Sequence, residues 1–346
     1  MKKETFIIDS NDINLWNKFL DQLPKEKKDV YYLANYANLY KNKFCEPKCF
    51  IYKTNDNIFF YPFIKRKILN TNYYDTVTPY GYGGPIVMSN NKDFISDSIN
   101  NFSNYAEENL IVCEQIKFHP LLKNYKIFQE VKTHKVYIAC KTVTIDCNLE
   151  IEFMLSNIYK KSNKEKIIKI KKKNAKISFY NNLETLISFQ KIYNENLKII
   201  RANDKYYFKS EYYNLIFKNL RENFFIANLD IDGEILASQL FIYGSVYGST
   251  HLQATTVKGK KEGVTNLLKH NVIIKAKELG LKYINFGGGR SNNENDSLLN
   301  FKKSFSNILS EFYIGEKIHN KNIYEELTIN KNKSIFFSYR KDNFIT

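Results

Sequence analysis

The stretch YINFGGGRSNNENDSLLNFKKSF, residues 283–305, contains the residues with the clearest possible chemical use. A strand-like apolar run ends in Gly287, Gly288 and Gly289, and Arg290 follows directly. Consecutive glycines weaken a strand, because each loses more backbone freedom on folding than an alanine does. We therefore expect a substrate or donor to approach this bare backbone. We expect the flat guanidinium of Arg290 to bind its phosphate or carboxylate.

A short helix is expected after this turn, and it contains Phe301 and Lys302. Asp296 suits the N-cap position of that helix, and a catalytic carboxylate is the alternative role of the same residue. Lys302 has Lys303 as its neighbour, so on residue type alone it is also typical of a solvated surface lysine.

A second group of residues lies in TPYGYGGPIV, residues 78–87. Its prolines and glycines, Gly83 among them, predict a rigid irregular loop from which Tyr80 and Tyr82 project. The interpretation as a function is an aromatic-lined acceptor pocket, and the plain alternative is packing within the loop. Asp75, just upstream, is a candidate for orienting an amino group of a ligand.

Two histidines are candidate site residues, one for a general base and one for the wall of a pocket. His119 precedes a proline in KFHPLL. A neutral imidazole accepts a proton near neutral pH, which suits a general base, whereas a buried structural histidine is the alternative. His251, in THLQAT, is a candidate for the wall of a pocket.

The segment TVKGKKEGV is expected to be a loop that leads into an amphipathic helix from about Thr265 to Leu279, which Gly280 ends. Such a loop gives backbone N–H groups to a pyrophosphate or a similar anion. An exposed turn is the alternative. The predicted donor-binding residues are Lys258, Gly259, Lys260, Lys261 and Gly263.

The charge of the chain also predicts an anionic partner. Its formal net charge is +16 and its isoelectric point is near 9.3. Nucleic acid, a phosphate-bearing cofactor and anionic lipid head groups all fit this charge. The lysine-rich segment 150–176 predicts a basic helix, interpreted either as a solvated face or as a nucleic-acid contact. Because lysine greatly outnumbers arginine, part of the charge reflects composition, and the few arginines, notably Arg201 and Arg290, are the more informative residues.

Metal binding and membrane insertion are not expected. The five cysteines and five histidines show no ligand spacing for zinc, and reduced, mostly buried thiols are the expectation. The amino terminus meets Asp9 and Asp12 before an apolar core could build, so it does not resemble a secretory signal. No apolar run approaches the ~18 residues of a membrane span. We expect a cytoplasmic protein, with peripheral membrane contact left open.

The order of elements predicts an α/β (α+β) protein with two domains, residues 1–148 and 149–346. Residues 224–255 read as three strands joined by tight turns at Asp232-Gly233 and Gly244-Ser245. The loop 257–263, a helix and the strand KYINF come next. This is the order of the central part of a GNAT-type acyltransferase fold, with mixed sheets flanked by helices.

Several of these stretches together resemble the Fem-type, or FemABX-like, branch of the GNAT superfamily, which carries two tandem GNAT-like domains. They are DVYYLANYANLY, YYDTVTPYGYGGPIV, KFHPLL, the basic segment, YYFKSEYYNL, THLQAT and NFGGGRSNNENDSLLNFKKSF. The resemblance implies transfer of an acyl or aminoacyl group to an amine of a cell-envelope precursor, either a peptidoglycan peptide or an amino sugar of a surface polysaccharide. The implied co-substrate is acyl-CoA or aminoacyl-tRNA, with no tightly bound cofactor.

The resemblance also implies roles for single residues. The lysine of the Phe-Lys pair, Lys302 here, supports the oxyanion, and Phe301 holds it in place. Arg201 and Tyr207 are expected to bind substrate. The chain departs from the family at His119, where an aspartate is usual, and around His251, where Thr250, Gln253 and Thr255 replace the usual tyrosine and serines.

Two other interpretations stay open at this stage. One is a basic RNA-binding protein without catalysis, for which the lysine-rich segment would be the docking surface. The other is a degenerate, non-catalytic relative of the enzymes. The donor, the acceptor and the oligomeric state are not fixed by the sequence.

Overall fold

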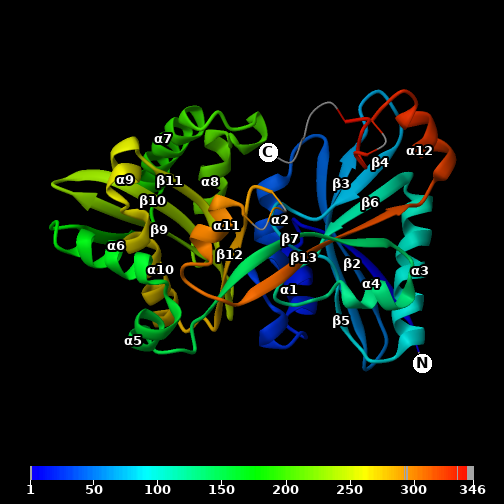
Figure 1. The fold of residues 1–346 in the computed structure, drawn as a ribbon. Helices are drawn as coiled ribbons and strands as arrows, with labels where there is room; N and C mark the ends of the chain where they lie inside the picture. The colour runs from blue at the N-terminus through cyan, green and yellow to red at the C-terminus, as the bar shows by residue number, and fades with distance from the viewer. Residues whose placement is uncertain (1, 292, 294, 333, 341–346) are drawn as a thin grey trace. The chain divides into compact units, whose positions relative to one another are not determined.

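The computed structural model describes residues 2–291, 293, 295–332 and 334–340 (Figure 1). Contacts divide these residues into two units. The first comprises residues 2–27, 31–139 and 312–340, and the second comprises residues 28–30 and 140–311. The division differs from the predicted boundary after residue 148, because the C-terminal strand pairs with a strand of the first unit. Residues 312–340 therefore pack with the N-terminal part of the chain.

The first unit has a mixed sheet in the order β1-β2-β3-β4-β6-β13, with β5 paired to β3. Its pairs are antiparallel except for the parallel pair of β4 and β6. Strands β2 and β3 form a hairpin, closed by a hydrogen bond from Thr54 N to Asn57 O at 3.0 Å. The strands are β1 (Glu4–Asp9), β2 (Cys45–Lys53), β3 (Ile58–Lys67), β4 (Tyr74–Val77), β5 (Ile86–Met88), β6 (Ile111–Lys117) and β13 (Leu309–Ile318).

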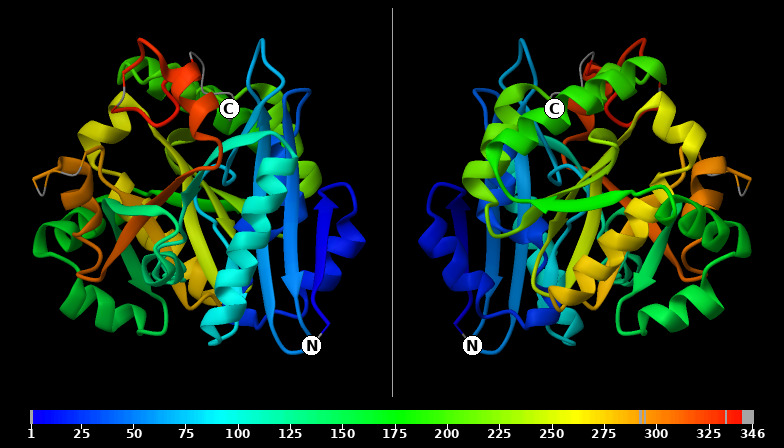
Figure 2. Two further views of the ribbon diagram at one scale, coloured as in Figure 1. Left: turned by 90° about the vertical axis from the view of Figure 1, so that its right-hand side faces the viewer. Right: turned by 90° about the vertical axis from the view of Figure 1, so that its left-hand side faces the viewer.

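Helices cover this sheet with aromatic side chains. The longest, α3, lies alongside the strands in Figure 2 and buries Phe102 against Phe50, Tyr61 and Phe63. The edge-to-face contacts among these rings stabilise the unit in addition to the burial of their apolar area. The helices are α1 (Ile13–Leu20), α2 (Ala34–Ala37), α3 (Lys92–Glu108), α4 (Lys126–Val131) and α12 (Lys321–Thr328).

Asp75 is the centre of a buried ion-pair network in this unit. Its side chain is fully buried, with Arg66 Nε at 2.7 Å and Arg340 Nε at 2.6 Å. The Tyr339 hydroxyl donates to the same carboxylate at 2.8 Å. Asp75 thus holds the C-terminal segment against β3, in place of the ligand amino group expected from the sequence.

The second unit has a mixed sheet in the order β7-β12-β11-β10-β9-β8, in which β11 and β12 are parallel. The predicted three-strand meander is confirmed as β9, β10 and β11. Asp232 (φ 56°) and Gly233 (φ 81°) form the first turn in the left-handed conformation that this dipeptide favours. The strands are β7 (Lys135–Asp146), β8 (Lys176–Tyr180), β9 (Phe224–Ile231), β10 (Glu234–Tyr243), β11 (Tyr247–Thr255) and β12 (Tyr283–Gly288).

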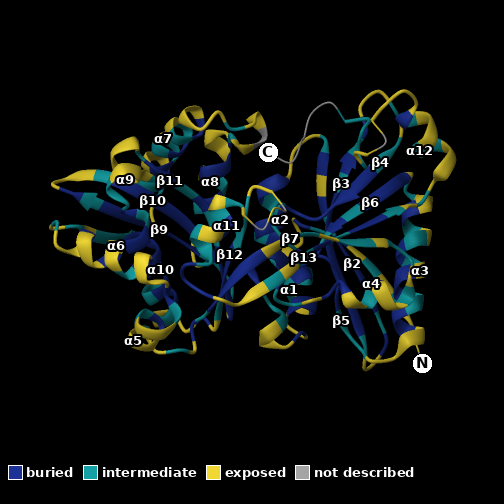
Figure 3. Ribbon diagram, in the orientation of Figure 1, coloured by how far each residue is buried: buried dark blue, intermediate teal, exposed yellow. Residues whose placement is uncertain are grey.

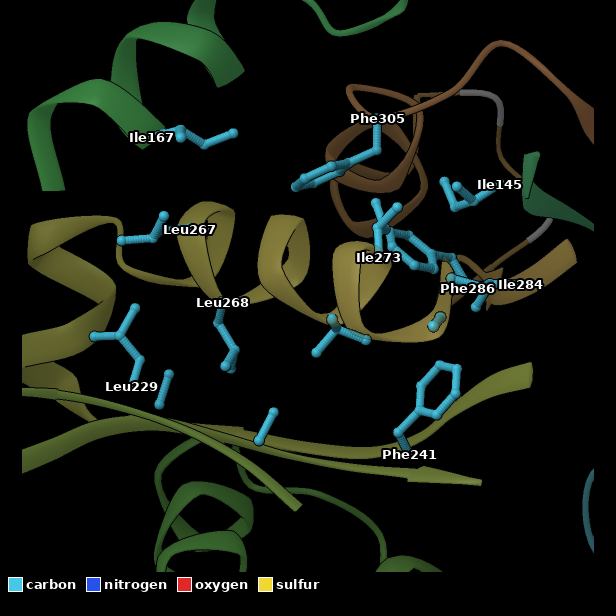
Figure 4. Packing of buried hydrophobic residues seen from close by; sticks show 14 of the residues in the cluster. Ile145, Ile167, Leu229, Phe241, Leu267, Leu268, Ile273, Ile284, Phe286 and Phe305 are labelled. Atoms are coloured by element: carbon cyan, nitrogen blue, oxygen red, sulfur yellow. The ribbon is translucent and has the colours of Figure 1, made fainter. Parts of the chain in front are cut away.

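Helix α10 lies between this sheet and helix α6, as Figure 4 shows. Leu229 and Phe241 of the sheet lie on one side of α10, and Ile167 of α6 lies on the other. The helix was predicted to be amphipathic, but it is buried on several sides because α6 covers the face away from the sheet. The helices are α5 (Ile151–Phe153), α6 (Lys161–Lys171), α7 (Leu183–Ile199), α8 (Ser210–Asn219), α9 (Val257–Glu262), α10 (Thr265–Glu278) and α11 (Ser297–Lys302).

The basic segment 150–176 forms α5, a π-helical turn at Met154–Ile158, and α6. Asn163, Ile167 and Ile170 of α6 are buried, while much of its remaining surface is exposed in Figure 3. Lys166 of α6 is exposed and lines the cavity of the second unit, whereas Lys164 is partly covered.

We predict that Asp75→Asn lowers the free energy of unfolding by about 3–5 kcal/mol, because it removes the buried partner of two guanidinium groups. Thermal and urea unfolding at neutral pH measure the loss. Asp97→Asn is the matched control, since Asp97 pairs with Lys3 at an exposed site where an ion pair contributes about 0–1 kcal/mol. Equal effects of the two substitutions would contradict the prediction.

Candidate active site

A cavity of about 490 Å³ in the second unit collects side chains from five helices and a strand. They come from α6, α7, β11, α9, α10 and α11, and from the turn after β12. Its cationic residues are Lys166, Lys260, Lys269, Arg290 and Lys302. Its polar and apolar residues are Asn196, Ile200, Thr250, His251, Gln253, Thr255, Gly263, Thr265, Asn266, Leu298 and Phe301.

The charged residues described in the lining of this cavity are all of one sign. Five of the described lining residues carry a cationic side chain, and none of the described lining residues is acidic. Opposite charges attract more strongly at buried groups such as Lys269 and Lys302 than they do in bulk water. The cavity is therefore built to receive an anionic group.

Lys302, at the C-terminal end of α11, is one of these cations. Its ammonium donates a hydrogen bond to Gly288 O at 2.7 Å, which fixes it beside the end of β12. Burial lowers the pKa of Lys302 to about 8, while Cys140 and Asp296 oppose that decrease. In most molecules the Lys302 side chain is thus still protonated near neutral pH. Phe301, its neighbour, lines the cavity and packs its ring 5.6 Å from that of Phe305.

The three glycines make room for the chain itself. Gly287 has a φ of 74°, which favours glycine. A Cβ at Gly288 would lie 2.9 Å from Cys140 Sγ, and a Cβ at Gly289 would lie 2.6 Å from Asp296 Oδ1. The sequence predicted that substrate or donor needs the bare backbone, but β7 and the side chain of Asp296 occupy the space at Gly288 and Gly289.

Asp296 holds this turn against α11. It is the N-cap of the helix, as predicted, and accepts from Leu299 N at 2.9 Å. Its other oxygen accepts from Arg290 N at 3.0 Å and Ser291 N at 3.2 Å. These hydrogen bonds, with that from Leu299 first, lower the pKa of the carboxyl. Both carboxylate oxygens accept hydrogen bonds from backbone N–H groups. Asp296 therefore positions Arg290 and the helix that carries Lys302, and we assign it no part in the chemical step.

The segment 257–263 forms a helix, α9, where the sequence predicted a loop. A Cβ at Gly259 would lie 2.3 Å from Leu236 O, so only glycine lets the helix pack this close to β10. Lys260 and Gly263 line the cavity. Lys258 forms an ion pair with Glu234 on the exposed side. Lys261 is exposed and does not line the cavity.

Helix α10 begins directly after Gly263, with Thr265 and Asn266 of its first turn at the cavity. No side chain caps its N-terminus. The first N–H groups of a helix have no partner within it, and the positive end of the helix dipole lies there. The helix start therefore adds partial positive charge beside Lys260.

His251 is part of the wall, as predicted. Its Nε2 lies 2.5 Å from the Tyr212 hydroxyl. Burial lowers the pKa of His251 to about 3, so the ring is neutral at physiological pH. Arg201 and Tyr207, which were predicted to bind substrate, do not line the cavity; Arg201 is exposed and has a φ of 50° just after α7.

The predicted acceptor residues lie in the first unit. Tyr82 packs its ring 5.6 Å from Tyr31 and 5.1 Å from Phe312, and Gly83 O accepts from Asn124 Nδ2 at 2.8 Å. The carbonyl oxygen of Tyr80 accepts a hydrogen bond from the Tyr36 hydroxyl at 2.6 Å. These contacts show loop packing at TPYGYGGPIV, and an acceptor pocket there stays a prediction.

His119 is 1% exposed. Its Nδ1 accepts from Leu122 N at 3.2 Å, so the neutral ring carries its hydrogen on Nε2. In this tautomer the lone pair of Nδ1 is occupied by a backbone N–H. The arrangement favours the structural alternative over the general base.

Sequence analysis missed Lys269 and Lys166. Each lies in a helix with several other lysines, so residue type alone does not distinguish them. The available signal was the position of Lys269 inside NLLKHNVII, where a charged residue interrupts an apolar run.

No family model and no curated protein matches the sequence. Among solved structures, the mixed sheets and their helices are those of tandem GNAT proteins. The chain is similar to FemX, with a TM-score of 0.76 and 13% identity over 94% of this chain and 99% of that chain. It is also similar to L-PGS from Bacillus licheniformis (TM-score 0.56, 16% identity, 93% and 96% covered) and to a tandem GNAT protein from the clavulanic acid biosynthesis pathway (0.55, 8%, 92% and 99%). These likenesses confirm the predicted fold.

Neither a metal site nor a membrane-spanning helix is present in the part of the chain that the structure describes. No group of three or more His, Cys, Asp and Glu side chains there could hold a metal ion. Nor does any described helix have the length and apolar character needed to cross a bilayer.

We predict that Lys302→Met stabilises the protein near pH 7 by about 1–3 kcal/mol, because a pKa lowered from 10.5 to about 8 means that the protonated side chain destabilises the fold. That destabilisation is fully present below about pH 8 and disappears as the pH rises towards 10.5. Melting temperatures at about pH 7 and about pH 10 measure the difference. Lys303→Met is the control, and a gain that does not depend on pH would contradict the prediction.

Proposed function

We propose that this protein is an N-acyltransferase of the GNAT and Fem type. It transfers an acyl or aminoacyl group from a polyanionic donor, acyl-CoA or aminoacyl-tRNA, to an amine of a cell-envelope precursor. The single observation that carries the proposal is the fixed ammonium of Lys302 in a cavity whose described charged residues are all cationic. The tandem GNAT fold shared with FemX supports it.

Lys302 supplies the electrostatic part of the reaction. Attack of an amine on an ester or thioester places negative charge on the carbonyl oxygen, and a fixed cation there lowers the barrier. The hydrogen bond to Gly288 O uses one donor of the ammonium and leaves the others to point to the reacting carbonyl. With a pKa of about 8, the side chain carries this charge at neutral pH.

The rest of the wall suits the donor. Lys260, Arg290 and the first turn of α10 present positive charge along one side of the cavity. Phosphates of a nucleotide or of RNA bind to such a combination of side chains and helix N-terminus. The neutral ring of His251 and the hydroxyls of Thr250 and Thr255 add hydrogen-bonding groups beside it.

The donor is tested by thermal shift with acetyl-CoA, a panel of longer acyl-CoA thioesters, and charged and uncharged tRNA. A ligand at about 100 times its dissociation constant stabilises the native state by about 2.7 kcal/mol. Transfer is then measured by mass spectrometry with a muramoyl peptide and a nucleotide-linked amino sugar as acceptors. Stabilisation by uncharged tRNA as strong as by charged tRNA, with no transfer from any donor, would favour the RNA-binding alternative.

We predict that Lys302→Ala lowers kcat by at least about 100-fold and leaves the dissociation constant of the donor within a few-fold, because its main contact forms in the transition state. Lys303→Ala is the matched control and keeps normal turnover. Turnover of Lys302→Ala equal to that of the control would remove Lys302 from the mechanism.

A further inference from the structure

A second lysine, Lys269 of α10, lines the same cavity as Lys302. Its side chain is 2% exposed. The neighbouring positions of the helix, Leu268, Val272 and Ile273, are buried in the apolar core, so the backbone at Lys269 is held firmly (Figure 4). A lysine in this position has lost almost all of its water, and the helix gives it little freedom to recover it.

Lys269 also has no counterion. Among the described residues it has no hydrogen-bond or ion-pair partner. It makes a cation–π contact with Phe286, whose ring centroid lies 4.8 Å from Lys269 Nζ. Contact with a ring face compensates a buried cation far less than the loss of its water costs it.

The charged groups that face the cavity from the other elements further destabilise the protonated form of Lys269. The charged and titratable groups there are Lys166 of α6, His251 of β11, Lys260 of α9, Arg290 after β12, and Lys302 of α11. Asp296 is committed to backbone N–H groups. His251 is neutral, and the others repel a further positive charge. Burial first, and then the charge of Lys302, hold the pKa of Lys269 well below its usual value.

We propose that Lys269 is the general base of the transfer reaction and takes the proton from the acceptor ammonium beside Lys302. This inference rests on the proposed function and deepens it. The two lysines have different roles. The ammonium of Lys302 stabilises the oxyanion, and the free amine of Lys269 deprotonates the acceptor so that its nitrogen becomes nucleophilic.

The steps balance as follows. The neutral Lys269 amine accepts one proton from the acceptor ammonium, and the free amine attacks the donor carbonyl to form the C–N bond. As the tetrahedral intermediate collapses, the bond to the leaving oxygen or sulfur breaks, and the second proton of the attacking nitrogen passes to that atom. Lys269 releases its proton to solvent when the products leave, so each turnover yields an amide, an alcohol or thiol, and one proton.

An alternative use of Lys269 is to bind a donor phosphate as a cation. The two roles differ in what an arginine does at this position, because arginine stays charged and forms good phosphate contacts. A base is lost in both Lys269→Arg and Lys269→Met. A phosphate contact is lost only in Lys269→Met.

The first experiment needs no substrate. Trace labelling of the whole protein with acetic anhydride, followed peptide by peptide across pH, gives the titration midpoint of each lysine, because only the free amine reacts. We expect the titration midpoint of Lys269 to lie well below the usual value for a lysine, and Lys303 serves as the control. In Lys302→Met the midpoint of Lys269 should move upward, since a repelling charge is gone. A midpoint of Lys269 equal to that of Lys303, or no labelling at any pH, would overturn the proposal.

The second experiment uses the donor and acceptor that the transfer assay identifies. Lys269→Arg and Lys269→Met should each lower kcat by about 100-fold or more, with donor affinity within a few-fold, and the acidic limb of the pH profile should be lost. Small primary amines should partly restore Lys269→Ala. Activity retained in Lys269→Arg would overturn the base and leave the proposed function standing. Absence of transfer by the unaltered protein would overturn both.

Discussion

The candidate site depends on one constraint: the ammonium groups of Lys269 and Lys302 are buried at a cavity that has no carboxylate among its described lining residues. Unpaired buried cations are unfavourable, and in most proteins they acquire a partner or give up the charge. Here the apolar packing of α10 between the sheet and α6 meets that cost. The structure thereby keeps two lysines in different states, with Lys302 mainly charged and Lys269 shifted towards the free amine.

The fold makes this arrangement rigid through short-range contacts. Asp296 ties the turn after β12 to the start of α11, and Lys302 ties the end of α11 back to Gly288 O. Gly288 is thus connected directly to Lys302, and Arg290 is connected through Asp296 to the first turn of α11. A cation that must meet a short-lived oxyanion benefits from such fixation, since no reorganisation is then needed during the reaction.

Local signals in the sequence predicted part of this accurately. The turn at Asp232-Gly233, the N-cap at Asp296 and the stop at Gly280 each follow from the preferences of one or two residues. The helix at 257–262 could not be predicted, since it depends on Gly259 packing against Leu236 O of another strand. Asp75 was likewise hidden, because its two arginine partners lie 9 and 265 residues away. Tertiary contacts decided these cases.

The buried charges described in the first unit, unlike Lys269 and Lys302, have partners of opposite charge. Asp75 is matched by two guanidinium groups. Glu114 is buried, which alone would raise its pKa, but a hydrogen bond and charge interaction with His134 at 2.9 Å lower it. Matched charges of this kind specify and hold a fold without being available to a ligand. The unmatched lysines of the second unit give the fold no such support, and binding an anionic substrate is the event that would compensate them.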